Sequence, residues 1–320
     1  MDRLLSCLRA AADSTRLRLL ALCAASDMNV SDLRNILGQS QPRVSRHLKL
    51  LCEAGLLDRY REGSWIFYRL ADDSCEGGRI AQSLIEMLPN GSQQLLQDRD
   101  RLDIIRCKRS EAAEDYFREN AERWDTVRSL HVEEEKVEEV ILDCFPNHLN
   151  NLLDIGTGTG RMLQLLSARI DRGIGIDTSR DMLAVARANL GSCGIRNCHV
   201  RLGDMYRLEL NDESFDGVVI HQVLHYSDNP GSVIIEASRI LQNNGLLVVV
   251  DFLSHNQEIL REKHAHMRLG FSDKEIADWF QAAKLVGQPV IRLEGSPLTV
   301  SLWTAIKNQD QRENNHEPVK

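Results

Sequence analysis

The chain has 320 residues, a length that suits two domains of about 150 residues each. Hydrophobic residues make up 42% and charged residues 27%, which is typical of globular proteins and excludes disordered and collagen-like classes. The net charge of −8 is unevenly spread: residues 1–70 hold 11 Lys and Arg against 7 Asp and Glu, and the rest hold 28 against 40. We therefore expect only the first part of the chain to meet a polyanion.

Neither a membrane span nor a metal site is indicated. The longest apolar runs, such as Leu246–Val250, have the length of a strand, whereas a bilayer span needs about 20 residues. The first residues lack the apolar core of a signal peptide, and the eight cysteines form no Cys-x-Cys or Cys-x-x-Cys pair. These features predict a cytoplasmic protein with reduced thiols, no membrane association and no bound metal.

The first domain, residues 1–75, is expected to form short helices closed by a β-hairpin. Apolar residues at helical spacing predict helices at Val30–Leu37 and Pro42–Ala54, joined by a short turn. Strands follow at Leu57–Arg61 and Trp65–Leu70. A second helix that is apolar on one face and cationic on the other suits the major groove of DNA. The expected DNA contacts lie on that face, in the turn before it and in the wing: Ser40, Gln41, Arg43, Ser45, Arg46, Lys49 and Arg61.

Three segments of this domain carry a family resemblance: LRAAADSTRLRLLALC, SQPRVSRHLKLLCEAGLL and DRYREGSWIFYRL. Over about 70 residues they closely resemble the ArsR/SmtB winged-helix repressors. The resemblance implies a homodimer that binds an inverted repeat in operator DNA. Metal-sensing members carry a Cys-x-Cys box before the recognition helix, where this chain has Met28-Asn29-Val30-Ser31, so thiolate metal sensing is not expected.

The second domain is expected to be an α/β domain. From Leu152 onward, buried strands alternate with helices, which predicts a parallel sheet with helices on both faces. The first strand, NLLDIG, carries Asp154 two residues before the first glycine and runs into a glycine-rich turn. Glycines there allow positive φ and close approach of a ligand. The dinucleotide-binding pattern Gly-x-Gly-x-x-Gly would need glycine at position 161, where this chain has Arg161. The turn therefore does not match that pattern. The three glycines of the turn are Gly156, Gly158 and Gly160.

Further candidates follow at the ends of the next strands. Asp177 comes 21 residues after Gly156, where a carboxylate can accept both hydroxyls of a ribose. Asp204 and Met205 end the third strand, which places a carboxylate and a thioether near an adenine ring. In order and spacing these residues resemble the class I S-adenosyl-L-methionine (SAM)-dependent methyltransferases, in particular the ubiquinone/menaquinone C-methyltransferase-like group.

This resemblance implies a Rossmann-like seven-stranded fold with bound SAM and a final antiparallel hairpin, for which Gln288–Leu293 and Leu298–Ile306 fit. The segment Tyr116–Asp125 resembles the aromatic segment that folds over the cofactor in these enzymes; an amphipathic core helix is the alternative. The expected cofactor contacts are Asp154, Gly156, Gly158, Gly160, Asp177, Asp204, Met205, His221, Tyr116 and Trp124.

The acceptor side is expected beyond the fourth strand. His221 and His225 are predicted catalytic residues, because an imidazole can take a proton near neutral pH. The alternative is that His225 only caps a loop. Arsenite methyltransferases rely on a set of cysteines around the active site, which Cys193 and Cys198 do not reproduce.

The sequence therefore predicts an all-α-rich winged helix-turn-helix domain followed by an α/β Rossmann-like seven-stranded methyltransferase domain. The expected parts are residues 1–75, a helical dimerisation or linker region at 76–120, the methyltransferase at 121–307 and a polar tail at 308–320. The predicted function is a metalloregulator-like transcriptional regulator fused to a SAM-dependent methyltransferase that acts on a small molecule. In the alternative, the second domain only senses SAM or S-adenosylhomocysteine (SAH), without turnover. A nucleic-acid acceptor is disfavoured, because the second part is acidic and has no base-flipping motif.

Overall fold

The computed structural model describes residues 1–62, 64–72, 75–89, 91–120 and 134–308, without the side chains of 106 and 109–120. It divides into two compact units, residues 1–112 with 256–258 and residues 113–255 with 259–320. Each unit has its own hydrophobic core. In the described ranges, no helix is both long and apolar enough to cross a membrane.

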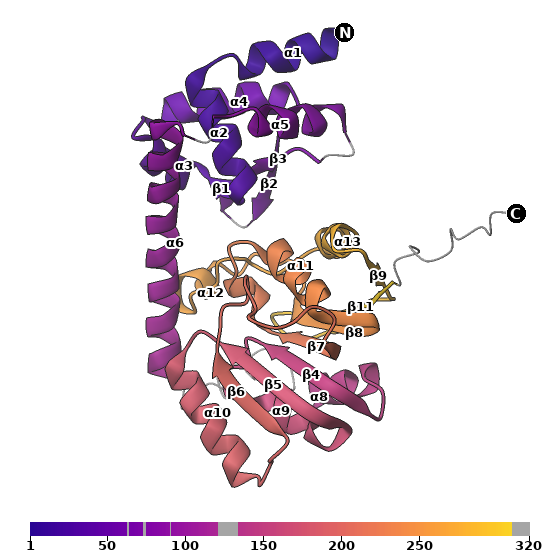
Figure 1. Ribbon diagram of the computed structural model, residues 1–320. Helices are drawn as coiled ribbons and strands as arrows, with labels where there is room; N and C mark the ends of the chain where they lie inside the picture. The colour runs from indigo at the N-terminus through magenta and orange to yellow at the C-terminus, as the bar shows by residue number, and fades with distance from the viewer. Residues whose placement is uncertain (63, 73–74, 90, 121–133, 309–320) are drawn as a thin grey trace, which may run out of the picture. The chain divides into compact units, whose positions relative to one another are not determined.

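The first unit is a winged helix-turn-helix domain (Figure 1). Its sheet has the order β1-β3-β2, and both pairings are antiparallel. Asp13 accepts a hydrogen bond from the N–H of Arg16 and so caps α2, and Asn29 caps α3 in the same way. Its elements are α1 (Asp2–Ala11), α2 (Ser14–Ala25), β1 (Met28–Asn29), α3 (Val30–Leu37), α4 (Gln41–Glu53), β2 (Leu57–Glu62), β3 (Trp65–Leu70), α5 (Glu76–Glu86) and the start of α6 (Gln93–Asn120).

The predicted helix-turn-helix is confirmed almost residue for residue. Helix α3 has the expected bounds, α4 begins one residue earlier and ends one earlier, and β2 extends one residue further. Helix α3 ends at Gly38, whose φ of +64° favours glycine. Val44, Leu48 and Leu51 are fully buried, so one face of α4 lies in the core and the opposite face is exposed.

The first half of α6 belongs to the first unit. Leu102 lies in its core, and the Arg101 guanidinium donates to the carbonyl of Ile36 at 2.6 Å. Asp98 accepts two hydrogen bonds from Arg18 of α2, at 2.5 and 2.6 Å, and both side chains are buried. The winged-helix core is therefore completed by residues beyond its hairpin.

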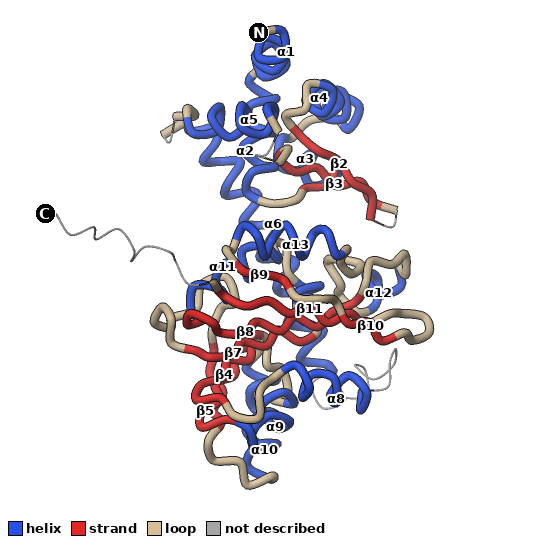
Figure 2. Tube along the Cα trace, turned by 90° about the vertical axis from the view of Figure 1, so that its right-hand side faces the viewer, coloured by secondary structure: helices blue, strands red, loops and turns tan. Residues whose placement is uncertain are grey.

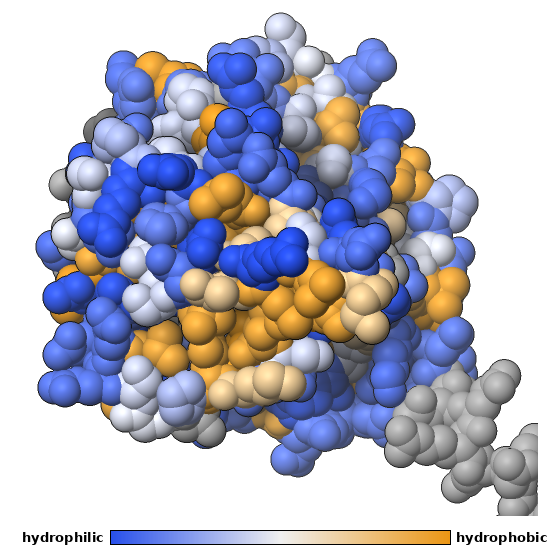
Figure 3. Space-filling view, turned by 90° about the horizontal axis from the view of Figure 1, so that it is seen from above, coloured by the Kyte–Doolittle hydropathy of each residue, from blue (hydrophilic) through white to orange (hydrophobic). Residues whose placement is uncertain are grey.

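One face of the first unit is apolar although it is exposed. Leu4, Leu5 and Leu8 on α1 retain 37–42% of their accessible surface. Figure 3 shows hydrophobic side chains gathered on the face that carries α1. A contiguous exposed apolar patch often marks an interaction site, whereas single exposed apolar residues are normal on any protein surface.

The second unit is a Rossmann-like α/β domain with a mostly parallel sheet of order β10-β11-β8-β7-β4-β5-β6 (Figure 2). Strands β4 to β8 are parallel, and β11 runs antiparallel to β8. The strand bounds are β4 (Leu149–Ile155), β5 (Ile170–Asp177), β6 (Cys198–Leu202), β7 (Phe215–His221), β8 (Leu241–Phe252), β9 (Leu285–Gly287), β10 (Ile291–Leu293) and β11 (Val300–Lys307). The helices are α8 (Glu134–Cys144), α9 (Arg161–Leu166), α10 (Arg180–Ser192), α11 (Pro230–Ile240), α12 (Glu258–Lys263) and α13 (Asp273–Ala282).

Both faces of this sheet are covered by helices. Val219 and Val250 face the core under α8 and α9, whereas Ile220 and Val249 face the core under α11 and α13. Burial on both sides explains why the strands read as continuous apolar runs instead of alternating ones.

The sheet contains eight strands instead of the expected seven, because its edge strand is split. The expected final hairpin is present as β10 and β11, and β9 pairs with the far half of β11. The interruption lies at residues 288–290, where Pro289 has no N–H to donate to the ladder.

Candidate functional site

The glycine-rich turn lies between β4 and α9. Gly156, Gly158 and Gly160 have φ of +71°, +51° and +81°, in the left-handed region that favours glycine. A Cβ at position 156 would lie 2.4 Å from a methyl carbon of Val223, so this position also has no room for a side chain. The N–H groups of Gly156 and Thr157 donate to the carbonyl of Ile176 at 2.8 and 2.9 Å, which holds the turn at the end of β5.

Asp154 supports this turn from inside the sheet. Its side chain is buried at the end of β4, and its Oδ2 accepts a hydrogen bond from the Thr157 hydroxyl at 2.6 Å. Of the predicted cofactor contacts, it is the one most clearly placed to shape the turn.

Asp177 ends β5 next to the turn. Its Oδ2 accepts from the N–H of Gly158 at 2.9 Å and its Oδ1 from the N–H of Ser179 at 2.8 Å. Burial raises the pKa of Asp177, and these backbone hydrogen bonds act against that rise. Each carboxylate oxygen has two acceptor sites, so both oxygens keep the capacity to accept a ligand hydroxyl.

Asp204 and Met205 follow β6, the strand next to β5. Asp204 is exposed and accepts from the N–H of Tyr206 at 2.9 Å, and Met205 lies partly buried against the core. The carboxyl ends of β4, β5 and β6 therefore bring together the turn, Asp177 and Asp204. This edge lies beside the switch point between β4 and β7, where open α/β sheets bind ligands.

This arrangement fits SAM. The glycine turn leaves backbone open to close approach, Asp177 offers acceptors for the ribose hydroxyls, and Asp204 and Met205 suit an adenine ring. Trp124 lies outside the described residues, as does the side chain of Tyr116, whose backbone belongs to α6.

The two predicted catalytic histidines lie at the end of β7 and in the loop that follows it. His221 is its last residue, and His225 lies in the short 3-10 helix Leu224–Tyr226; both are buried. His225 places Nδ1 2.7 Å from Oδ1 of Asp251, and its ring stacks on that of His266 with centroids 4.0 Å apart. Neither Asp251 nor the stacking of His225 on His266 is predicted from the sequence. The available signal was a carboxylate directly after the apolar run of β8.

In the described part of the chain, no cluster of three or more His, Cys, Asp or Glu side chains could hold a metal ion. Met28 and Cys23 are buried in the core, and burial raises the pKa of the Cys7 and Cys23 thiols, which disfavours the thiolate form that binds metals.

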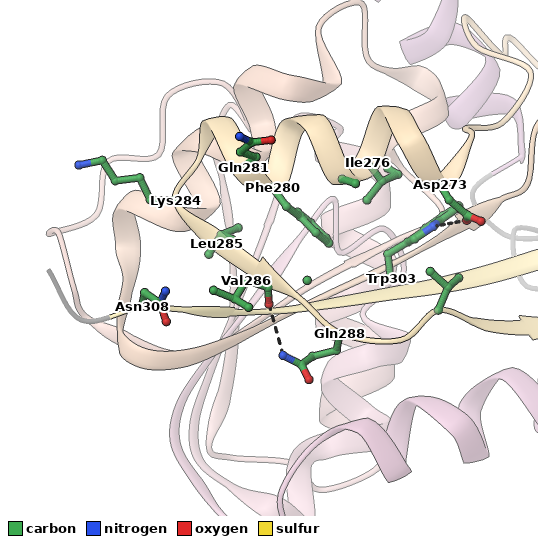
Figure 4. A pocket seen from close by; sticks show the side chains of 13 residues that line it. Asp273, Ile276, Phe280, Gln281, Lys284, Leu285, Val286, Gln288, Trp303 and Asn308 are labelled. Atoms are coloured by element: carbon green, nitrogen blue, oxygen red, sulfur yellow. Dashed lines mark hydrogen bonds between the residues drawn. The ribbon is translucent and has the colours of Figure 1, made fainter. Parts of the chain in front are cut away.

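A cavity of about 600 Å³ lies elsewhere in the second unit, between α13 and β9. Figure 4 shows Phe280, Leu285 and Trp303 at its floor, with Gln281 and Lys284 toward its rim. Strand β9 pairs with the last residues of β11, which lie beside the amino-terminal part of β8. The glycine-rich turn follows the carboxyl end of β4, which runs in the same direction as β8. The cavity is therefore at the opposite end of the sheet from the turn.

The candidate DNA-binding face lies on α4 and the wing. Its predicted contacts are exposed except Ser45, which is half-buried: Ser40, Gln41, Arg43, Arg46, Lys49 and Arg61. Lys49 also forms an ion pair with Glu53 of the same helix, at 3.7 Å. A cationic outer face over a buried apolar one is the arrangement that a groove-binding helix requires.

We expect Arg46→Ala and Lys49→Ala to weaken operator binding, because each removes a cation from this face. If Lys49 contacts a phosphate, its loss should also reduce the slope of log affinity against log salt by about one unit. Fluorescence anisotropy across a salt series measures both effects. Lys274→Ala is a matched control, since Lys274 is equally exposed and pairs with Asp278 at the same helical spacing. Binding that does not respond to salt would contradict a phosphate-contacting α4.

Comparison with known proteins supports both domains. Residues 13–59 match the family described as bacterial regulatory protein, arsR family, and residues 153–249 match the family described as methyltransferase domain. The first match covers α2 to β2, and the second runs from β4 into β8.

Individual relatives match one domain each. The arsenical resistance operon repressor of Escherichia coli is 49% identical over 61 residues, 19% of this chain and 52% of the repressor. The arsenite methyltransferase of Aquipseudomonas alcaligenes is 34% identical over 110 residues, 31% of this chain and 32% of that enzyme. The chain spans about half the length, or less, of these curated relatives.

A solved structure supports the fold of the second unit. One chain of the complex between the Haloferax volcanii Trm112 methyltransferase activator and a methyltransferase superposes with a TM-score of 0.55 at 19% identity. The match covers 62% of this chain and 98% of that one. The chain therefore carries an ArsR-family helix-turn-helix domain followed by a class I SAM-dependent methyltransferase domain.

Proposed function

We propose that the chain is a transcriptional regulator fused to a methyltransferase that transfers the methyl group of SAM to a small molecule. The observation that carries the proposal is the glycine-rich turn with Asp177 beside it at the carboxyl edge of the sheet. When bound, SAM supplies an electrophilic methyl group on a sulfonium sulfur. The chain's own residues would bind and orient it: Asp177 would accept the ribose hydroxyls, Asp204 and Met205 would adjoin the adenine, and His221 would serve the acceptor side. Orientation of this kind supplies much of the catalysis when the acceptor is already a nucleophile.

A small-molecule acceptor is favoured over a nucleic acid. Beyond residue 70 the chain holds 28 cationic against 40 anionic side chains, which opposes binding of a polyanion. The test incubates the protein with methyl-labelled SAM and a cell extract. We expect label in the small-molecule fraction together with SAH. Label confined to protein or nucleic acid would contradict the proposal.

The second candidate function is a sensor that binds SAM or SAH without turnover. Cofactor binding and the burial of His221 and His225 are compatible with an enzyme and with a sensor. Calorimetry with SAM and SAH, followed by assay for SAH formation, separates them. Binding accompanied by SAH formation favours the enzyme. Binding with no SAH in any extract favours the sensor.

We further propose a homodimer that binds an inverted repeat in operator DNA in the cytoplasm. The exposed apolar side chains of α1 support a second copy as the occupant of that face. A winged helix from each copy would then meet one half-site.

Leu8→Glu is expected to weaken this dimer by roughly 2 kcal/mol or more, because a carboxylate would be buried without a partner. Sedimentation across a concentration series measures the shift toward monomer. Ile235→Glu is the control, since Ile235 is an equally exposed apolar residue on α11 of the second unit. Equal behaviour of the two variants would show that α1 does not form the interface.

We also expect the two domains to be coupled through α6. Its residues up to 112 belong to the first unit, where Asp98 anchors them, and its last residues belong to the second. A typical coupling is about 1–3 kcal/mol, and it must be reciprocal between operator and cofactor. Operator titrations with no cofactor, with SAM and with SAH measure it, and Asp177→Ala should remove the effect. Three identical curves would indicate two independent domains in one chain.

A further inference from the structure

We propose that His225 is a positioning residue, held by Asp251, that presses the loop after β7 against the glycine-rich turn. In this role His225 acts through the loop and takes no proton from the acceptor. The inference rests on the proposed cofactor site at the turn.

Asp251 is fully buried near the end of β8, and its carboxylate forms hydrogen bonds with the ring and backbone of His225 and with the backbone of Phe252. Oδ1 lies 2.7 Å from Nδ1 of His225 and accepts from the N–H of Phe252 at 2.8 Å. Oδ2 accepts from the N–H of His225 at 3.2 Å. A carboxylate anion only accepts hydrogen bonds, so the proposal assigns the shared proton of this pair to Nδ1 of His225.

The His225 ring is buried among other rings. The side chain is only 3% exposed. Its ring centroid lies 4.0 Å from that of His266, 4.2 Å from that of Tyr226 and 5.4 Å from that of Phe252. Burial of the ring and the use of Nδ1 by Asp251 favour a role in holding the loop over direct contact with an acceptor.

The backbone of His225 joins another segment to the same loop. Its carbonyl accepts hydrogen bonds from the N–H groups of Met267 and Arg268, at 2.9 and 3.0 Å. The side chain and the backbone of one residue therefore connect the loop to β8 and to the segment before α13.

The loop reaches the cofactor turn through Val223. Gln222 leaves β7 with a φ of +51°, and its N–H donates to the carbonyl of Val250 at 2.7 Å. Val223 then occupies the space in front of Gly156, where a Cβ would lie 2.4 Å from it. His225, held by Asp251, lies two residues after Val223, so we expect the position of Val223 to depend on this pair.

The test compares His225→Asn with His225→Gln, using SAH as the probe in calorimetry on the full chain. The amide nitrogen of Asn can occupy the place of Nδ1 and donate to Asp251, whereas that of Gln reaches the place of Nε2. We expect Asn to keep SAH affinity within about twofold and Gln to weaken it about tenfold, as for loss of a hydrogen bond to a buried charge. Histidine-selective ¹⁵N NMR of the wild type should show the proton of His225 on Nδ1.

Four outcomes would overturn the inference. They are wild-type affinity in both variants, equal loss in both, retention by Gln with loss by Asn, or a ring protonated only at Nε2. Absence of SAH binding by the wild-type protein would instead refute the proposed cofactor site itself.

A double-mutant cycle tests whether Val223 is the link. Val223→Ala removes the contact with the turn and leaves the pair of His225 with Asp251 in place. If His225 acts through Val223, the combined Val223→Ala and His225→Gln variant should lose little more SAH affinity than the worse single variant. Additive losses would overturn this route.

Discussion

Replacing Asp98 by Ala is expected to destabilise the winged-helix unit by about 3–5 kcal/mol, because it leaves the buried guanidinium of Arg18 without its partner. The carboxylate holds this guanidinium with two hydrogen bonds, at 2.5 and 2.6 Å, and is itself only 2% exposed. Hydrogen exchange of peptides from α3 and α4 measures the loss, since these helices lie in the same core as the start of α6.

The exposed carboxylate of Asp100, two residues further along α6, gives the matched control. Asp100→Ala should leave exchange within experimental error of the wild type. Changing Arg18 and Asp98 together to apolar residues should recover part of the loss, because no buried charge then remains. Equal exchange in Asp98→Ala and Asp100→Ala would mean that α6 is not anchored by this pair.

The second large effect is expected at Asp177. Asp177→Ala should weaken SAH binding by about 1–3 kcal/mol, or about 5- to 150-fold, because the ribose hydroxyls would lose their acceptor. The substitution also removes the acceptor of the Gly158 and Ser179 N–H groups, which loosens the turn. Calorimetry with SAH measures the change.

Asp171→Ala serves as the control, since Asp171 is exposed on the same strand, at its amino end. It should bind SAH as the wild type does. Unchanged SAH affinity in Asp177→Ala would show that the carboxyl end of β4, β5 and β6 is not the cofactor site.

Much of the fold could be predicted from local sequence signals. Gly38 ends α3 in a left-handed conformation, the spacing of Val44, Leu48 and Leu51 orients α4, and apolar runs mark the strands of the second unit. The glycine-rich turn was identified in the same way, because positive φ restricts the residues that can stand there. Each of these signals depends on a residue's own backbone preference or on neighbours within a few positions.

The sequence alone therefore determined the order of the two domains, the bounds of the helix-turn-helix and the glycine-rich turn. Only the tertiary structure decided that Arg18 pairs with Asp98, 80 residues away, and that Asp251 holds His225 across the ends of two strands. It also decided the split edge strand, where β9 and β10 share β11. No local pattern specifies such pairs, because a buried charge is tolerated only where folding brings its partner to it, and that meeting depends on the packing of the whole core.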